Sequence, residues 1–461
     1  KPSAKVGGKV AIESVTVIKK KRLIIAFNPT FGEYPIRAGQ VEAIYSIARN
    51  LMPQEYQDYK LFLKCNGTGI EEFVPPVYDH SKEKAAARKE KHDKKHHVTA
   101  NLVYRASQPY TVNHGLQDKH IALWQSHGYY YEQKLLRWEW QRARIFQTVE
   151  DLYTQSYVLP YLVPMLENSG AVVMLPRERD VQLNEVIVDN DLTNSGFSEM
   201  NSDSTWKSSQ IPGFANIKES YTQGENPFTM GTARVITFGK KGESAGAKYY
   251  PAIPDRGEYA VYVSYQSFPN STERAIYTVH HKGGDTKFFV NQKMGGGTWI
   301  YLGTFLFDKG QNPDGYVDLF NVSSDKEEIL SADAVKFGGG MGNIARKPAE
   351  AGSQTNVPSS SSDVAKTIKM PLDITPETSG YPRFTEGARY WLQWAGFNDT
   401  IYSANAGTND YNDDYMSRGR WVNVLSGGSL KNPNENGYKI PLDLSFAFHT
   451  DAGTTLNDSI I

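Results

Sequence analysis

The clearest hydrophobic pattern of the chain lies between residues 119 and 179. Residues 120–124 (HIALW) form an apolar run that stops before Gly128, as expected of a buried strand that ends in a sharp turn. The apolar positions between 159 and 166 recur at helical spacing, and residues 171–175 (AVVML) form a second apolar strand. A strand, a helix and a strand in this order predict a parallel sheet with flanking helices, which is an α/β domain.

A second apolar strand-like run lies near the end of the chain. Residues 442–448 (LDLSFAF) lead directly into His449, just as the first strand leads into His127. Ligands of parallel sheets gather beyond the carboxyl ends of the strands. We therefore expect the two histidines to face each other at one edge of the sheet, in a single domain that is interrupted in sequence.

Between these two parts, residues 196–337 alternate apolar and polar positions in short runs separated by Gly, Asn, Asp and Pro. This pattern predicts an inserted all-β sandwich. A flexible linker is expected from Gly338–Gly340 through the Ser/Thr/Pro-rich tract to about residue 362. After it, residues 385–397 read as a helix and residues 398–436, rich in Asn, Asp and Gly, as surface loops.

The first part of the chain predicts a small α+β region. Strands are expected at residues 10–12, 23–27 and 60–63, with a helix at 40–50. Residues 81–97 are densely charged and include His92, His96 and His97, whose helical spacing would suit a metal, although a solvated charged arm is favoured. The expected organisation is an N-terminal region at 1–115, a first half-domain at 116–191, the sandwich at 192–345, and a linker with the second half-domain at 346–461.

Composition narrows the function classes. The chain has 50 Lys and Arg residues and 51 Asp and Glu residues, so its net charge is near zero. The net charge therefore does not indicate binding to nucleic acid or to a membrane surface. The single cysteine, Cys65, excludes an internal disulfide, and no run approaches the ~20 apolar residues of a membrane span. No signal peptide is visible, and export is left open. The 28 tyrosines are typical of glycan-facing or β-rich secreted proteins.

Two histidines at strand ends and one carboxylate are the ligand set of a catalytic zinc site. Zinc lowers the pKa of its bound water to about 7 and polarises carbonyl groups, which suits amide hydrolysis. Four carboxylates follow His127, and Glu150 is favoured because it precedes the helical segment. The four are Glu132, Glu139, Glu150 and Asp151.

The stretches ALWQSHG, LENSGAVVMLPRERD and FAFHTDAG resemble the core of zinc-dependent N-acetylmuramoyl-L-alanine amidases. The resemblance covers about 115–190 and 365–461. It implies an amidase/phosphorylase-hydrolase type of α/β fold, zinc as cofactor and metal ligands at His127, Glu150 and His449. Ser126 stands where the family has glycine.

The same family has a catalytic glutamate on a later strand, and no residue of this sequence matches it. Either the second half-domain is incomplete in this chain, or the acid/base work falls to another group, for which Asp451 is the candidate. Arg177 and Arg137 are candidates for contacting anionic glycan–peptide groups.

The stretches GTWIYLGTFLFDKGQNPDGYVDLFN and SADAVKF resemble the golvesin-type module associated with xanthan lyases. This resemblance implies carbohydrate binding, with Trp299, Tyr301 and Trp206 as candidate stacking platforms. The alternative is that Trp299 and Tyr301, two apart on one strand, pack the core. For His280 and His281 we expect opposite faces of a strand, and for Asp333 a hydrogen-bonding role.

The sequence therefore predicts a secreted or envelope-associated bacterial zinc hydrolase that cleaves the N-acetylmuramoyl–L-alanine bond of peptidoglycan. Its partners would be peptidoglycan or another glycan, with no nucleic acid and no membrane span. Two other functions stay open: a zinc carboxypeptidase-like peptidase with the same ligand set, and a non-catalytic carbohydrate-binding surface protein.

Overall fold

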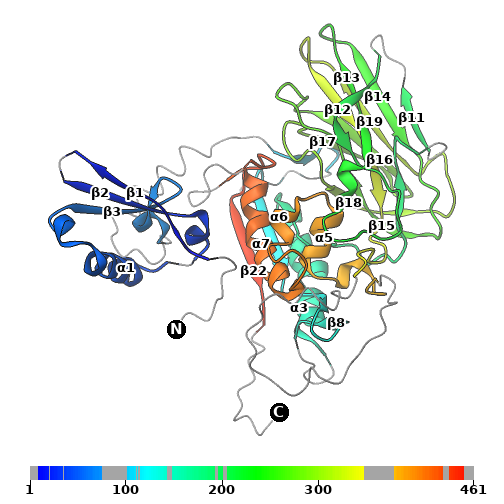
Figure 1. The fold of residues 1–461 in the computed structure, drawn as a ribbon. Coiled ribbons are helices and arrows are strands. Elements are labelled where there is room, and N and C mark those ends of the chain that lie inside the picture. The colour runs from blue at the N-terminus through cyan, green and yellow to red at the C-terminus, as the bar shows by residue number, and fades with distance from the viewer. Residues whose placement is uncertain are drawn as a thin grey trace. The chain divides into compact units, whose positions relative to one another are not determined.

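Figure 1 shows the fold in a computed structural model. The structure describes residues 9–19, 21–34, 36–74, 101–108, 110, 112, 115–142, 148–192, 196–200, 205–346, 378–428 and 436–450. The chain divides into two compact units, each made of two sequence segments. The first unit is Lys1–Ala100 with Trp421–Leu442, and the second is Asn101–Arg420 with Asp443–Ile461.

The first unit contains a four-stranded sheet in the order β1-β2-β3-β4. β1 and β2 form an antiparallel hairpin, and β2 runs parallel to β3 because helix α1 connects them. Alternate residues of β3 are buried against α1 on one face of the sheet. The expected α+β character is thus confirmed within the described residues. The elements are β1 (Ile12–Ile18), β2 (Arg22–Phe27), η1 (Pro29–Glu33), α1 (Ala38–Leu51), η2 (Gln54–Tyr56), β3 (Lys60–Cys65), β4 (Thr68–Gly69) and η3 (Ile70–Phe73).

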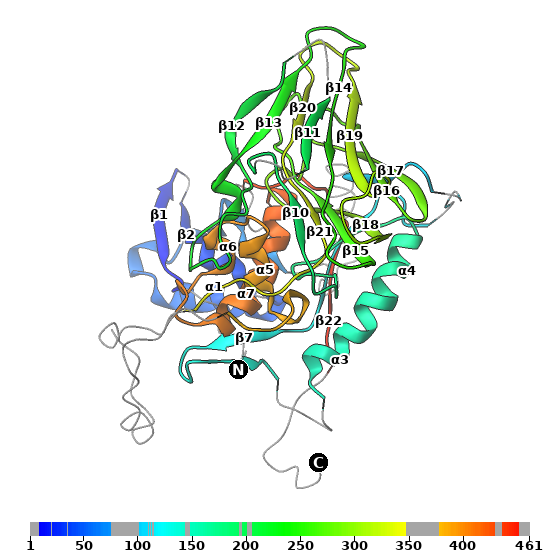
Figure 2. The ribbon, with the colours of Figure 1, turned by 90° about the vertical axis from the view of Figure 1, so that its right-hand side faces the viewer.

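The second unit contains a small parallel sheet in the order β22-β6-β9. A helical rod of α3, η5 and α4 connects β6 to β9, and Figure 2 shows it running beside β22. Its apolar residues pack on the sheet with those of β6 and β9. The elements are β6 (His120–Gln125), β7 (Tyr129–Glu132), β8 (Arg137–Trp140), α3 (Glu150–Tyr157), η5 (Val158–Leu162, π-helical), α4 (Val163–Asn168), β9 (Val172–Met174), η7 (Arg383–Thr385), α5 (Ala388–Trp394), α6 (Asp399–Tyr402), α7 (Asp410–Ser426) and β22 (Leu444–Phe448). The residues of α7 from Trp421 on are counted in the first unit.

The remaining strands of the second unit form three antiparallel sheets, in the orders β10-β21-β15-β18, β11-β14-β19-β16-β17-β5 and β12-β13-β20. Phe288 of β17 and Phe305 of β18 meet between the first two sheets, with ring centroids 6.2 Å apart. The strands are β5 (Val103–Arg105), β10 (Val186–Val188), β11 (Phe197–Met200), β12 (Lys207–Gly213), β13 (Gly231–Thr237), β14 (Ser244–Tyr249), β15 (Gly257–Val263), β16 (Ala275–His281), β17 (Gly284–Val290), β18 (Ile300–Phe307), β19 (Tyr316–Val322), β20 (Ile329–Ala332) and β21 (Val335–Phe337), with the short helix η6 (Pro227–Thr229).

The described chain is rich in β-sheet and has few helices, and the expected β-sandwich accounts for most of its strands. Of the expected parallel α/β domain, the described residues show a small sheet flanked by the helical rod. The parallel sheet has three described strands, and most pairings elsewhere are antiparallel. β5 also pairs with β17 in the sandwich, whereas the sequence placed it in the N-terminal region. No helix of the described residues is long and apolar enough to cross a membrane.

Two local expectations are wrong. The predicted loops at 398–436 contain the 17-residue helix α7, whose acidic residues are buried and paired. Asp410 bonds Arg389 at 2.9 Å and Asp414 accepts from Gln141 at 2.8 Å, so tertiary contacts outweigh a polar composition. Gly338–Gly340 belong to the packed module and not to a flexible linker: Gly338 donates to Ala260 and all three are buried.

Candidate metal centre

The parallel pairing of β6 and β22 sets the position of the two histidines. Phe448 lies opposite Gln125, and the backbone N–H of Ser126 donates to the Phe448 carbonyl at 2.8 Å. Since parallel strands end at the same edge, the residues that follow both strands emerge together. The rings of His127 and His449 lie 4.8 Å apart, centroid to centroid, although 322 positions separate them in sequence.

Glu150 completes the group from the first residue of α3. Its carboxylate is buried, and it accepts hydrogen bonds from the Ser126 hydroxyl at 2.9 Å and from the Thr450 N–H at 3.0 Å. One ligand atom from each of His127, Glu150 and His449 lies within 4.8 Å of the other two. In the part of the chain that the structure describes, this is the group of His, Cys, Asp and Glu residues that could hold an ion.

Ser126 orients His127. Its hydroxyl donates to Glu150, so its oxygen accepts from Nδ1 of His127, 2.8 Å away. This leaves Nε2 of His127 with its lone pair available, the form in which histidine binds a metal. Ser126 has φ +39°, in the left-handed region that favours glycine, which accounts for the glycine that the resembling family has at this position.

A guanidinium group lies where the ligand atoms converge. Nη2 of Arg142 is 2.9 Å from Nε2 of His127, and Nε of Arg142 is 3.5 Å from the Glu150 carboxylate. Arg142 is thus a cation held by two of the three proposed ligands. The sequence analysis did not single out this residue, because Arg142 belongs to none of the motifs found there.

The electrostatics keep both imidazoles neutral. Burial, followed by the positive charges of Arg418 and Arg142, lowers the pKa of His127 to about 3. Burial and Arg418 also lower the pKa of His449. Arg418 comes from α7 and donates to the Ser126 carbonyl at 2.8 Å. Neutral imidazole is the ligand form, so this donor set fits zinc.

The other candidate carboxylates differ in their surroundings. Asp151 lies 3.5 Å from Nδ1 of His127, and burial raises its pKa to about 6. Glu132 accepts from the Tyr130 hydroxyl, and Glu139 pairs with Arg137. Of the four, Glu150 is the residue that joins both histidines. Asp451 and the cluster of His92, His96 and His97 lie outside the described residues.

The expected substrate contact by Arg177 does not fit its position. Arg177 is 1% exposed and donates to the backbone carbonyls of Gln125, His127 and Glu386, among others. It therefore fastens the turn after β6. Gly128, in this turn, approaches the backbone of Glu386 so closely that a Cβ would lie 2.6 Å from it. The Arg137 side chain pairs with Glu139 but is 65% exposed, so it remains accessible to solvent.

The expected stacking platforms do not form an exposed face. Trp299 is 7% exposed and packs on Phe214 and Phe228, with centroids 4.7 and 5.2 Å away. Tyr301 lies under the Arg179 guanidinium, 3.8 Å from its ring centroid. Trp206 is also 7% exposed. The core-packing alternative is the one that the structure supports.

Three other polar residues of the sandwich have internal partners. His280 lies between the carboxylates of Asp285 and Asp318, at 2.8 and 2.7 Å, while His281 contacts Thr286 at 2.9 Å. Different partners are consistent with opposite faces of the strand. Asp333 is buried and accepts from the Phe214 N–H and from a serine hydroxyl, as expected of a hydrogen-bonding residue.

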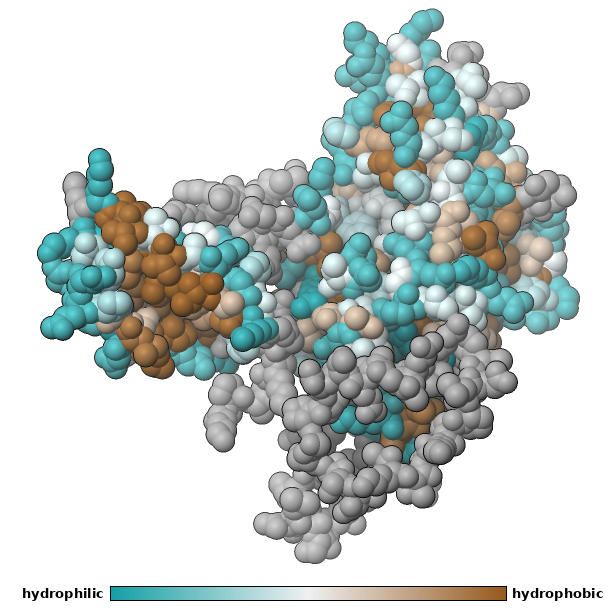
Figure 3. All heavy atoms as spheres, viewed as in Figure 1, coloured by the Kyte–Doolittle hydropathy of each residue, from teal (hydrophilic) through white to brown (hydrophobic). Residues whose placement is uncertain are grey.

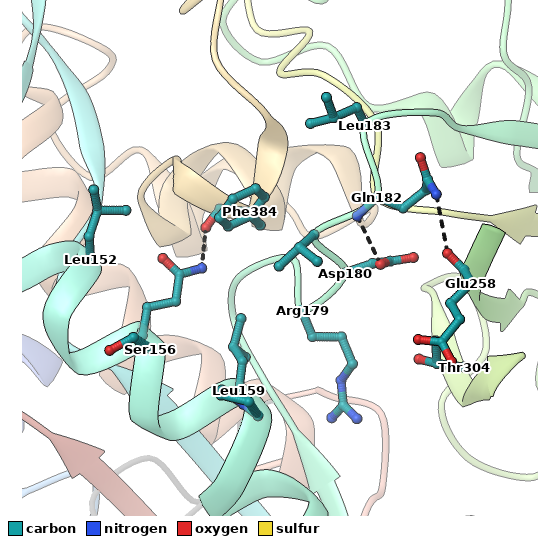
Figure 4. Close-up of a pocket in the computed structure, with 13 residues that line it drawn as sticks. Leu152, Ser156, Leu159, Arg179, Asp180, Gln182, Leu183, Glu258, Thr304 and Phe384 are labelled. Carbon is teal, nitrogen blue, oxygen red and sulfur yellow. Dashed lines mark hydrogen bonds between the residues drawn. The ribbon is translucent and has the colours of Figure 1, made fainter. Parts of the chain in front are cut away.

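A cavity of about 770 Å³ lies between the helical rod and the sandwich (Figure 4). Two glutamine side chains of its lining donate to backbone carbonyls: Gln155 to that of Phe384 and Gln182 to that of Glu258. Its wall combines apolar side chains with amide and carboxylate groups. The lining comprises Leu152, Gln155, Ser156, Leu159, Pro160, Arg179, Asp180, Val181, Gln182, Leu183, Glu258, Thr304 and Phe384.

Comparison with known proteins identifies the sandwich. Residues 186–339 match the Golvesin C-terminal domain. A xanthan lyase of Bacillus sp. (strain GL1) is 33% identical over 90 residues, which are 19% of this chain and 10% of that protein. The chain therefore spans a tenth of the length of this curated relative.

Two solved structures are similar to about a third of this chain. A Paenibacillus xanthan lyase is 25% identical with a TM-score of 0.26, covering 33% of this chain and 13% of that one. A family 11 carbohydrate-binding module of Clostridium thermocellum is 10% identical with a TM-score of 0.20, covering 34% and 97%. The family match at residues 186–339 and the xanthan lyase relative show that the chain carries a golvesin-type β module of the kind associated with xanthan lyase.

Proposed function

We propose that the chain is a glycan-directed protein in which a golvesin-type sandwich accompanies a zinc-dependent amidase core. Its reaction would be hydrolysis of the amide bond between N-acetylmuramic acid and L-alanine in peptidoglycan. The observation that carries this proposal is the convergence of His127, Glu150 and His449, from three separate segments, within 4.8 Å. This substrate implies a secreted or envelope location.

The chain's own residues have separate tasks in this proposal. His127, Glu150 and His449 would hold the metal, and Ser126 keeps His127 and Glu150 in their orientations through its two hydrogen bonds. Zinc bound there would activate water and polarise the amide carbonyl. Arg142, whose side chain is 31% exposed, would present a positive charge to the carboxylates of a peptide stem once a metal ion displaces it from His127.

The glycan is the expected partner of the second unit's sandwich. Since Trp299 and Tyr301 are packed, we place sugar contact at the cavity beside the helical rod, where apolar surface and hydrogen-bonding groups such as Gln182 occur together. Gln182→Ala, with exposed Lys240→Ala as matched control, should reduce retention on insoluble peptidoglycan or xanthan. Equal retention of both variants would contradict the placement.

Digestion of intact peptidoglycan tests the reaction. Zinc-loaded protein should release peptides and free the lactyl groups of muramic acid, and chelator should stop the release. Release of single amino acids instead would favour the zinc carboxypeptidase-like alternative, which uses the same ligand set.

A non-catalytic carbohydrate-binding surface protein is the second candidate. It is favoured by the golvesin match at residues 186–339, the part of the chain whose relatives are identified, and by the Arg142 guanidinium at the ligand atoms. Retention on glycan with no zinc bound and no product released would support this candidate over the amidase.

A further inference from the structure

The proposed reaction leaves two features of the molecule unexplained. Figure 3 shows apolar side chains gathered on the first unit, where Val15 and Val17 are 58% and 51% exposed, but the described residues do not indicate which molecule would cover them. The second feature is the contact of the Arg142 guanidinium with two of the proposed metal ligands. These contacts are specific enough to define a role for Arg142.

Arg142 uses the lone pair that a metal ion would need. The Nδ1–H of His127 donates to the Ser126 hydroxyl oxygen, so Nε2 is the acceptor atom of this ring. Nη2 of Arg142 lies 2.9 Å from Nε2 and donates to it. One lone pair cannot accept a guanidinium N–H and bind a metal ion at the same time. Arg142 and a metal therefore exclude each other at His127.

The second contact of Arg142 is an ion pair. Its Nε lies 3.5 Å from the carboxylate of Glu150, whose side chain is 4% exposed. A buried carboxylate is costly without a cation or hydrogen-bond donors, and arginine keeps its positive charge throughout the physiological pH range. The guanidinium therefore supplies positive charge where a divalent cation would supply it, and the two cations repel each other.

The remaining contacts of Arg142 give the side chain a second position. Its Nη1 donates to the Gln141 carbonyl at 3.2 Å and to the Tyr411 hydroxyl at 3.0 Å, and neither acceptor is a proposed ligand. Its backbone N–H donates to Asp151 at 3.2 Å, which fixes the main chain. Because 31% of the side chain is exposed, Nη2 and Nε can leave the two ligands without opening the fold.

Arg418, the other arginine at this centre, has different contacts. It is 5% exposed, donates to the Ser126 carbonyl at 2.8 Å and pairs with Asp414 at 3.4 Å. These partners are a backbone group and a carboxylate outside the proposed ligand set, so Arg418 can keep them when a metal binds. Arg142 is thus the cation whose contacts a metal must replace.

We propose that Arg142 is an internal competitor that controls metal loading: it closes the metal centre by binding His127 and Glu150, and opens it by turning away. This inference deepens the proposed function and rests on the metal centre assigned there. Only the open form can bind a metal, so the apparent affinity is lowered in proportion to the fraction of molecules that are open. Arg142 therefore sets the zinc concentration above which the centre fills.

Competition with a chromophoric chelator measures the zinc affinity of the full chain and of its variants. Arg142→Gln should bind zinc about tenfold more tightly than the wild type, because it has no cation to displace. Arg142→Lys keeps the charge but cannot bond both ligands through a planar fork, so its gain should be smaller. Arg137→Gln, which removes an exposed positive charge of β8, is the matched control and should bind zinc as the wild type does.

Equal or weaker zinc binding by both Arg142 variants overturns the proposal, as does a gain that Arg137→Gln matches. A wild type and an Arg142→Gln protein that both bind no zinc overturn it as well. The amidase reaction has a separate outcome. Tighter zinc binding by Arg142→Gln without release of peptides from peptidoglycan would support this inference and contradict the proposed function, and peptide release with zinc affinities independent of Arg142 would do the reverse.

Discussion

The parallel sheet and the β-sandwich of the second unit each carried a site predicted from the sequence, and the two outcomes differ. His127 and His449, placed after the ends of β6 and β22, lie beside each other with Glu150. Trp299, which directly precedes β18, and Tyr301, which lies inside it, are packed against neighbouring side chains.

The difference follows from what a strand pattern determines. Parallel strands share an edge, so a residue just beyond a strand is located by topology alone. A residue inside a strand is located only to one of two faces, and the strand pattern does not show what packs on that face. Here Phe214 and Phe228 cover Trp299, and the Arg179 guanidinium lies over Tyr301.

The largest expected effect concerns the strand-end residues. His449→Ala and Glu150→Gln should each abolish stoichiometric zinc binding, because each removes one of three protein ligands. Metal analysis after dialysis of purified protein measures this. His280→Ala, which alters a histidine inside a sandwich strand, should retain the wild-type zinc content; a His449→Ala protein that keeps its zinc would contradict the assignment.

Removing the packed indole should affect stability. Trp299→Ala should lower the free energy of unfolding by about 3–5 kcal/mol, since it leaves a cavity against Phe214 and Phe228. Denaturant unfolding measures the loss. Tyr104→Ala, at a 54% exposed aromatic of the same sandwich, should change stability by less than about 1 kcal/mol. If Trp299→Ala left the stability unchanged but lost retention on glycan, Trp299 would be a sugar-stacking residue and not a core residue.

Replacing the histidine inside β6 should change only the free energy of unfolding. His120 is 0% exposed, accepts from the Leu102 N–H at 3.1 Å, and burial lowers its pKa to about 4. In the unfolded chain the imidazole of His120 takes up a proton near pH 6.5, well above its pKa in the folded chain. The neutral, buried His120 therefore makes its full contribution to the free energy of unfolding above pH 6.5, and this contribution is lost as pH falls toward 4. Between pH 7 and 4 the loss should reach about 3 kcal/mol.

Comparing His120→Gln with the wild type isolates this contribution. Two other groups with shifted pKa values titrate in both proteins. As pH falls, His127 lowers the free energy of unfolding, as His120 does, and Asp151 raises it. Urea unfolding at several pH values should therefore show a flatter pH dependence for His120→Gln. Identical slopes for the two proteins would show that His120 does not titrate as its burial implies.

The smallest expected effect concerns Ser126. Ser126→Ala removes the hydroxyl that orients His127 and Glu150, and should weaken zinc binding by about 10–100-fold without abolishing it. Competition with a chromophoric chelator measures the affinity. Ser198→Ala, at an exposed serine of β11, is the control. If Ser126→Ala and the wild type bound zinc with equal affinity, Ser126 would have no role in metal binding.

The sequence predicted the elements whose pattern is local: β6, the helical rod after Glu150, β9 and the strands of the sandwich. It missed α7, because the helix is polar and is stabilised by contacts such as Asp410 with Arg389 that no local pattern records. For the same reason it missed Arg418, which α7 delivers to the turn at Ser126. Arg142 was missed because only the folded chain brings it to His127.

The burial of Arg177 could not be read from the sequence either. A charged residue after a strand resembles a ligand-binding group, and only the fold shows that backbone carbonyls of two segments surround it. Topology therefore predicted where the candidate ligand residues meet. Long-range packing decided whether a charged residue nearby is exposed, as Arg137 is, or supports the turn, as Arg177 does.

A zinc-edge anomalous difference map from crystals of the zinc-loaded chain tests the central claim most directly. The account predicts one strong peak in contact with His127, Glu150 and His449, with the Arg142 guanidinium moved away from Nε2 of His127. A map with no peak there, and with Arg142 still bonded to His127, would contradict it.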